Sequence, residues 1–108
     1  MNWFRSLFTR RKPIAPENVT RANVLAWLKT QNPNKQTNVE WSRACPIARF
    51  LEAHGHTNAF VGMYNYHSDQ QSTTYFVDDV GREIMGPVGN EPKTYGEVVK
   101  RLEGVVPA

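Results

Sequence analysis

The sequence is poor in cysteine and has no long apolar run. Cys45 is the only cysteine among the 108 residues, so the chain can form no internal disulfide and no cysteine-based zinc site. No apolar run approaches the roughly 18 residues of a membrane-spanning helix. The scattered glycines form no G-x-x-x-x-G-K phosphate-binding loop. We therefore expect a cytoplasmic protein without a metal or cofactor.

The overall composition is that of one small domain. Hydrophobic residues make up 40% of the chain and charged residues 21%, proportions that argue against global disorder. A chain of this length supports one domain with one core. Pro13 and Pro16 separate the first residues from the rest. We predict a basic amphipathic arm and linker over residues 1–16 and a single α+β domain over residues 17–108.

The positive charge is confined to the first third of the chain. Residues 1–35 carry seven basic side chains and one acidic side chain, a net +6, whereas residues 36–108 carry six basic and nine acidic side chains, a net −3. Such asymmetry is typical of a basic segment that meets an acidic partner. The first residues also hold large aromatic side chains that are costly to leave in water. We predict that this arm binds a partner through Trp3, Phe4, Arg5, Phe8, Arg10, Arg11 and Lys12.

Three segments have the apolar spacing of amphipathic helices. The first runs from about Thr20, its predicted N-cap, to about residue 31. The second runs from Pro46 to about residue 54, with Cys45 as its N-cap. The third begins at Thr94, which is the first residue of a T-x-x-E capping box. All three are expected to pack their apolar faces against a common core.

Aromatic and β-branched residues predict three strands between the second and third helices. These strands cover residues 58–67, 72–78 and 82–85 and are joined by short turns. Along the first strand Phe60, Tyr64 and Tyr66 share one parity, so we expect all three to face the core. The order α-α-β-β-β-α favours an α+β fold, with helices packed on one face of a three-stranded antiparallel meander.

Cys45 has the position in this sequence that most suggests catalysis. A thiol at a helix N-terminus meets free N–H groups and the helix dipole, both of which favour the thiolate. His67 ends the first predicted strand, and Asp78 ends the second. The order Cys45, His67, Asp78 therefore resembles a miniature of the papain-like hydrolases, although no motif of that family flanks Cys45. A small cysteine hydrolase is an alternative; the simpler interpretation makes Cys45 a buried structural residue.

Other kinds of site and partner find less support. His54, His56 and His67 lack the Cys or acid that would complete a zinc-ligand spacing. The order α-β-β-β-α over residues 45–103 resembles that of double-stranded-RNA-binding domains. Residues 94–97 hold an acid and no lysine where that family grips phosphates, so nucleic acid is disfavoured. An anionic membrane surface bound by residues 1–12 is an alternative, because basic amphipathic helices bind such lipids.

These patterns together favour binding over catalysis. We predict a small non-enzymatic binding module, an accessory or inhibitor-type protein of a bacterium or its phage. Its basic aromatic N-terminal region would dock on another macromolecule, with aromatic anchors and a charged rim. A protein partner is expected first, and association with a second copy is an alternative.

Overall fold

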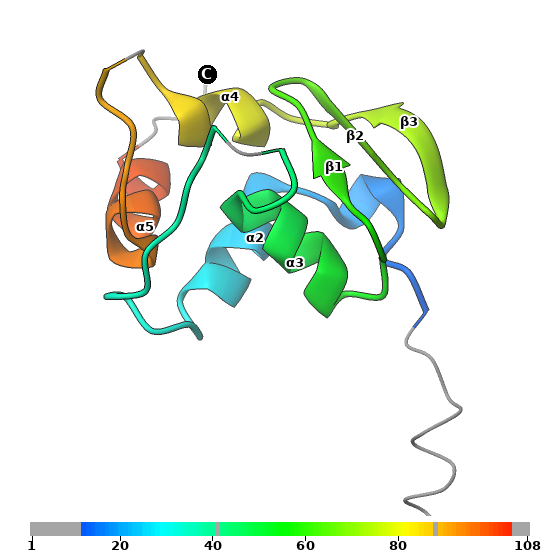
Figure 1. Cartoon of the computed structure of the whole chain (residues 1–108), viewed down its shortest axis with the longest axis horizontal. Helices are drawn as coiled ribbons and strands as arrows, with labels where there is room; N and C mark the ends of the chain where they lie inside the picture. The colour runs from blue at the N-terminus through cyan, green and yellow to red at the C-terminus, as the bar shows by residue number, and fades with distance from the viewer. Residues whose placement is uncertain (1–11, 41, 88, 105–108) are drawn as a thin grey trace, which may run out of the picture.

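A three-stranded antiparallel sheet lies beside a group of helices in the computed structural model, which describes residues 12–40, 42–87 and 89–104 (Figure 1). The predicted α+β class and the order α-α-β-β-β-α are confirmed, with one short helix added after the sheet. None of the described helices is long and apolar enough to cross a membrane. The elements are η1 (Pro16–Asn18), α2 (Arg21–Leu28), α3 (Pro46–Ala53), β1 (Phe60–Val61), β2 (Asn65–Ser68), β3 (Gln71–Tyr75), α4 (Val80–Met85) and α5 (Tyr95–Glu103).

Side-chain caps start three helices where the sequence predicts them. The hydroxyl of Thr20 and that of Thr94 each accept a hydrogen bond, 3.2 Å long, from a backbone amide in the first turn of α2 and α5. At α3 the cap is the thiol of Cys45, whose Sγ accepts a hydrogen bond from the Ala48 amide at 3.4 Å. Each cap satisfies an N–H that has no partner within its helix. These three starts are therefore determined by local sequence.

The segment predicted as one long strand, residues 58–67, is a hairpin. It forms both β1 and β2, because the chain turns at Gly62, whose amide donates a hydrogen bond to the Asn65 carbonyl at 2.8 Å. Across the hairpin Val61 pairs with Tyr66, and β2 then pairs antiparallel with β3. The predicted meander is present in the order β1-β2-β3, but its strands occupy different residues. A glycine inside a strand pattern often marks such a break.

The third predicted strand, residues 82–85, is wrong: this segment belongs to α4. Val80 and Ile84 are buried at the i, i+4 spacing of a helix face. Gly81 allows the helix to approach the sheet, since a Cβ at this position would collide with the Met63 carbonyl oxygen in the β1–β2 turn. Two apolar positions are a weak signal for a helix, and the turn residues before this segment favour a strand.

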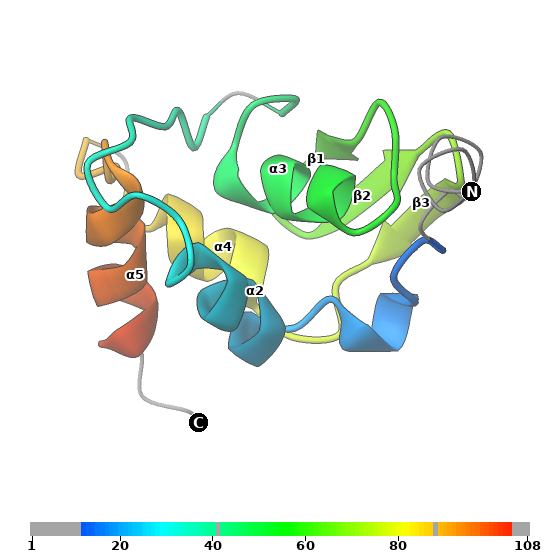
Figure 2. The same ribbon diagram turned by 90° about the horizontal axis from the view of Figure 1, so that it is seen from below.

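One core joins the inner face of the sheet to the helices. Seen from below, the sheet lies at one end of the molecule and α5 at the other, with α2, α3 and α4 between them (Figure 2). The Trp27 ring meets the Phe50 ring edge-on, with centroids 5.9 Å apart. Tyr66 points inward from β2 and stacks on Phe76 at 5.3 Å. The buried side chains that fill this core include Val24, Leu28, Ile47, Leu51, Val98 and Leu102.

A bidentate ion pair connects α2 with α4 across 62 positions of sequence. Nε of Arg21 donates to Glu83 at 2.8 Å and Nη2 donates at 2.5 Å, and the Glu83 side chain is only 8% exposed. Asp78 adds a second link, because one carboxylate oxygen accepts from the Arg21 amide at 2.7 Å and the other from the Val80 amide at 3.0 Å. These bonds neutralise a nearly buried carboxylate and satisfy the first N–H of both helices.

We expect Arg21→Ala to lower the free energy of unfolding by about 3 kcal/mol, because it leaves the Glu83 carboxylate nearly buried without its cation. The matched control is Arg82→Ala, which removes an exposed ion pair with Asp79 and should change this free energy by less than about 0.5 kcal/mol. Urea unfolding followed by circular dichroism measures both variants. Equal effects would contradict the role assigned to Arg21.

The Tyr66 hydroxyl is buried without a hydrogen-bond partner among the described residues. We expect Tyr66→Phe to leave the free energy of unfolding unchanged or to raise it by about 1 kcal/mol, since it removes only the unpaired polar group. Tyr75→Phe, at a side chain 72% exposed, is the control and should change little. If Tyr66→Phe instead lowered the melting temperature by several degrees, the hydroxyl would have a stabilising partner.

Candidate partner-binding surface

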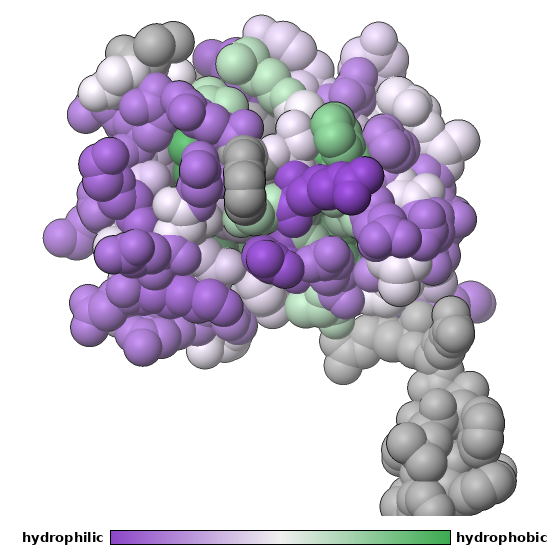
Figure 3. All heavy atoms as spheres, viewed as in Figure 1, coloured by the Kyte–Doolittle hydropathy of each residue, from purple (hydrophilic) through white to green (hydrophobic). Residues whose placement is uncertain are grey.

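All exposed large hydrophobic side chains of the described residues belong to the sheet or to the segments that flank its strands. They are Phe60 (38% exposed), Met63 (39%), Tyr64 (56%), Tyr75 (72%) and Val77 (58%), and we call this set the sheet patch. Figure 3 shows a mostly hydrophilic face around α5 and the loop before α3, with hydrophobic atoms surfacing above it near α4 and the β1–β2 turn. An exposed apolar cluster of this kind is typical of an interaction site.

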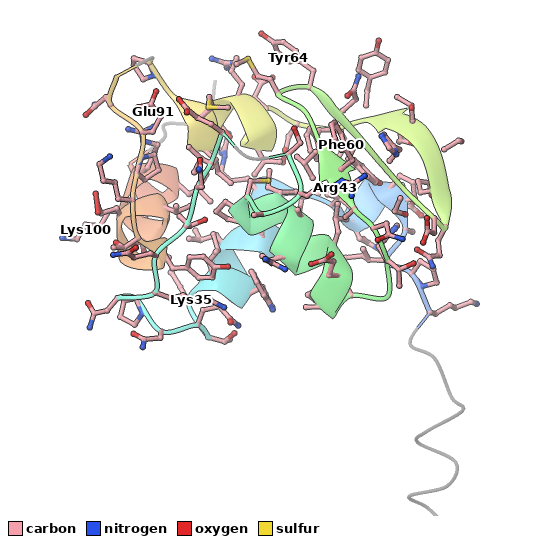
Figure 4. The ribbon with its side chains drawn as sticks, in the orientation of Figure 1. Lys35, Arg43, Phe60, Tyr64, Glu91 and Lys100 are labelled. Atoms are coloured by element: carbon pink, nitrogen blue, oxygen red, sulfur yellow. The ribbon has the colours of Figure 1, made fainter. Side chains whose placement is uncertain are left out.

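Phe60 of the sheet patch lies in a stacked column with the ring of His67 and the guanidinium of Arg43. Phe60 and His67 are cross-strand neighbours in β1 and β2, and their rings stack with centroids 5.1 Å apart and planes 15° apart. The Arg43 guanidinium lies 6.0 Å from the Phe60 ring centroid (Figure 4). Arg43 is held there because the carbonyl of Ser42 accepts a hydrogen bond from the Val61 amide at 2.8 Å. The column offers flat ring surface together with positive charge.

Two tyrosines occupy the end of the sheet that lies near α4. The Phe76 amide, just after β3, donates a hydrogen bond to the Tyr64 carbonyl at 2.9 Å. Tyr75 pairs with Asn65 in the register of β2 and β3, one position further along. Because these backbone contacts hold the two segments together, Tyr64 and Tyr75 are presented from adjacent parts of one rigid sheet.

The sheet patch is a candidate surface that the sequence analysis did not select. Of the three aromatic residues expected in the core, only Tyr66 is buried, at 1% exposed, whereas Phe60 and Tyr64 are exposed. In one continuous strand residues 60 and 66 would share a face. In the hairpin Phe60 stands opposite His67, so it lies on the other face of the sheet from Tyr66. Gly62 is the signal in the sequence that could have revealed this.

The basic arm joins the domain beside the same sheet. Of its predicted contact residues the structure describes only Lys12, which is exposed. The Ile14 amide donates to the His54 carbonyl at 2.9 Å, and the Ile14 carbonyl accepts from Nε2 of buried His56 at 3.2 Å. Nδ1 of that ring accepts from the Ser68 hydroxyl at 2.6 Å, at the β2–β3 turn. Outside the described residues lie Trp3, Phe4, Arg5, Phe8, Arg10 and Arg11.

The three candidate catalytic residues have separate surroundings. Burial raises the pKa of the Cys45 thiol, although backbone N–H groups and the charge of Arg49 oppose this effect. His67 stacks on a phenylalanine at the surface, and Asp78 accepts from the amides that begin α2 and α4. In the part of the chain that the structure describes, no hydrogen bond joins any two of Cys45, His67 and Asp78. Burial therefore favours the protonated form of this thiol.

Two of the three histidines make hydrogen bonds within the fold. His54 Nδ1 donates to the Phe50 carbonyl at 2.7 Å, which satisfies a carbonyl near the end of α3. Both ring nitrogens of His56 form hydrogen bonds, one with the Ser68 hydroxyl and one with the Ile14 carbonyl. Within residues 12–40, 42–87 and 89–104, no three His, Cys, Asp or Glu side chains are grouped so that they could hold a metal ion.

We expect the Cys45 thiol to react with Ellman's reagent at least about tenfold more slowly in the native protein than in urea at neutral pH, because it is 4% exposed and its pKa is raised. Since burial disfavours the thiolate, the native rate should also rise at a higher pH than the rate of the unfolded chain. Rapid labelling of the folded protein at neutral pH would instead support an active-site thiol.

Comparison with known proteins finds no match for this chain among protein families, curated proteins or solved structures.

Proposed function

We propose that this protein is a non-enzymatic binding module that docks on a protein partner through the basic arm and the sheet patch. One observation carries the proposal: every exposed large hydrophobic side chain of the described residues lies in or beside one small sheet. Full burial of such a side chain in a complex is worth about 1.5–3 kcal/mol. A partner that covers the sheet patch would recover much of this free energy.

The residue types of the sheet patch suit a protein partner. Tyrosine, phenylalanine, methionine and arginine are enriched at the centres of protein interfaces. Tyr64 and Tyr75 would supply large, rigid contact area, and Arg43 would supply a charge already placed over an aromatic ring. We expect the partner to present an apolar pocket surrounded by acidic groups.

The anchoring of the arm allows the arm and the sheet patch to act together. Ile14 is fixed by hydrogen bonds to His54 and His56, and His56 bonds Ser68 at the β2–β3 turn. Phe60 pairs with His67, next to this turn, so an arm that joins the domain here can contact the same partner as this part of the sheet patch. Linking two contact surfaces raises the effective concentration of the second once the first is bound.

A cysteine hydrolase is the weaker proposal, because Cys45 is buried and its pKa is raised. An anionic membrane surface is the other alternative for the arm, and it does not account for the sheet patch. Vesicle co-sedimentation separates it from a protein partner. Binding to anionic vesicles that needs residues 1–12 but not Tyr64 or Tyr75 would favour the membrane.

The proposal is tested by affinity capture from the native host, with the intact chain, a chain lacking residues 1–12 and the double variant Tyr64→Ser/Tyr75→Ser. We expect one protein to be retained by the intact chain and lost from both altered chains. With that protein purified, each alteration should raise the dissociation constant by at least about tenfold, as removal of interface anchors does.

The matched control is Lys100→Ser on α5, which changes an exposed side chain far from the sheet (Figure 4). Circular dichroism should show an unchanged fold in all variants, because Ile14 and its hydrogen bonds are retained. Equal capture by the chain lacking residues 1–12 would remove the arm from the proposal. Unfolding of that chain would make the arm part of the core and overturn its docking role.

A further inference from the structure

A hollow on another part of the surface has the properties of a small-molecule site. It lies between the loop that follows α2 and the starts of α3 and α5, and its volume is about 510 Å³. This volume falls within the range of ligand pockets. Its lining includes Lys35, Thr37, Asn38, Arg49 and Tyr95 and shares no residue with the sheet patch. Figure 4 shows Lys35 near the lower edge of the view and Tyr64 at the upper edge.

Backbone hydrogen bonds hold the walls of the hollow in place. The Tyr95 amide donates to the Lys35 carbonyl at 2.9 Å, and the Thr37 amide donates to the Lys93 carbonyl at 3.0 Å. Gln36 forms an isolated antiparallel bridge with the residue that caps α5. The loop is therefore tied to the start of α5 on both sides of the hollow. A site held in this way loses little conformational freedom when a ligand binds.

The lining of the hollow is positively charged. It contains Lys35 and Arg49 and no acidic residue. The Lys35 amine lies 5.5 Å from the Tyr95 ring centroid and forms no ion pair with a described carboxylate. Nη1 of Arg49 donates to Glu52 at 3.1 Å outside the hollow. Burial raises the pKa of the Tyr95 hydroxyl, and the charge of Arg49 opposes this rise. The charge of Arg49 is therefore felt at Tyr95, which belongs to the lining of the hollow.

We propose that this hollow binds a phosphate monoester of metabolite size. Arg49 suits it because the guanidinium fork matches a phosphate, and Lys35 suits it as a point charge. Lys35 has no ion pair with a described carboxylate, whereas Arg49 pairs with Glu52 outside the hollow, so an anionic group in the hollow would balance the positive charge that remains. Asn38, which is exposed, adds a hydrogen-bond donor. This proposal is independent of the protein partner.

The test uses the full chain and phenyl phosphate as the probe, with calorimetry and amide NMR at low salt. We expect saturable shifts of the amides of residues 35–38 and 95. Lys35→Ala and Arg49→Ala should each weaken binding by about tenfold or more, as loss of a charged hydrogen bond does.

Lys100→Ala is the matched control, since it removes one positive charge from α5 outside the hollow and should leave the affinity unchanged. An equal loss in this variant would mean general charge attraction and would overturn the site. The site would also be overturned if no saturable shifts appeared at phenyl phosphate concentrations up to about 10 mM, because a specific site binds its ligand at much lower concentrations. Benzoate binding as tightly as phenyl phosphate would overturn the assignment to phosphate.

Discussion

The position of α4 depends on the ion pair between Arg21 and Glu83. Arg21 begins α2, and its two bonds to Glu83 hold α4 beside that helix. α4 lies in turn against the β1–β2 turn, where Gly81 leaves room for the Met63 carbonyl. Met63 and Tyr64 belong to this turn, so the ion pair helps to place one end of the sheet patch. A nearly buried charge pair of this kind specifies position more than it adds stability.

Three side chains with reactive groups make hydrogen bonds that hold the fold. The Cys45 thiol caps α3, and Asp78 accepts hydrogen bonds at the starts of α2 and α4. His56 forms a hydrogen bond with Ile14, where the arm joins the domain. Each of these groups satisfies backbone atoms that would otherwise be unpaired. The parts left free are surfaces: exposed rings on the sheet and a cationic hollow beside α5. An exposed apolar cluster such as the sheet patch is typical of an interaction site.

The parts of the fold that could be predicted from sequence are those with local causes. The caps at Thr20, Cys45 and Thr94 act within one helical turn, so their residue types and spacing are sufficient. The split of residues 58–67 into two strands required the pairing of Phe60 with His67, which no local pattern specifies. The sheet patch could not be predicted for the same reason, because the exposure of Phe60 depends on that register. The hollow beside α5 depends on contacts between distant segments.

By itself, then, the sequence determined the α+β class, the helix starts and the confinement of excess positive charge to the first third of the chain, because composition, spacing and caps are local properties. The tertiary structure decided which aromatic rings are buried and which are exposed. It also decided that residues 82–85 are helical and that Lys35 and Arg49 line one hollow. These outcomes depend on pairings between segments far apart in the chain, which follow from closure of the core rather than from any single segment.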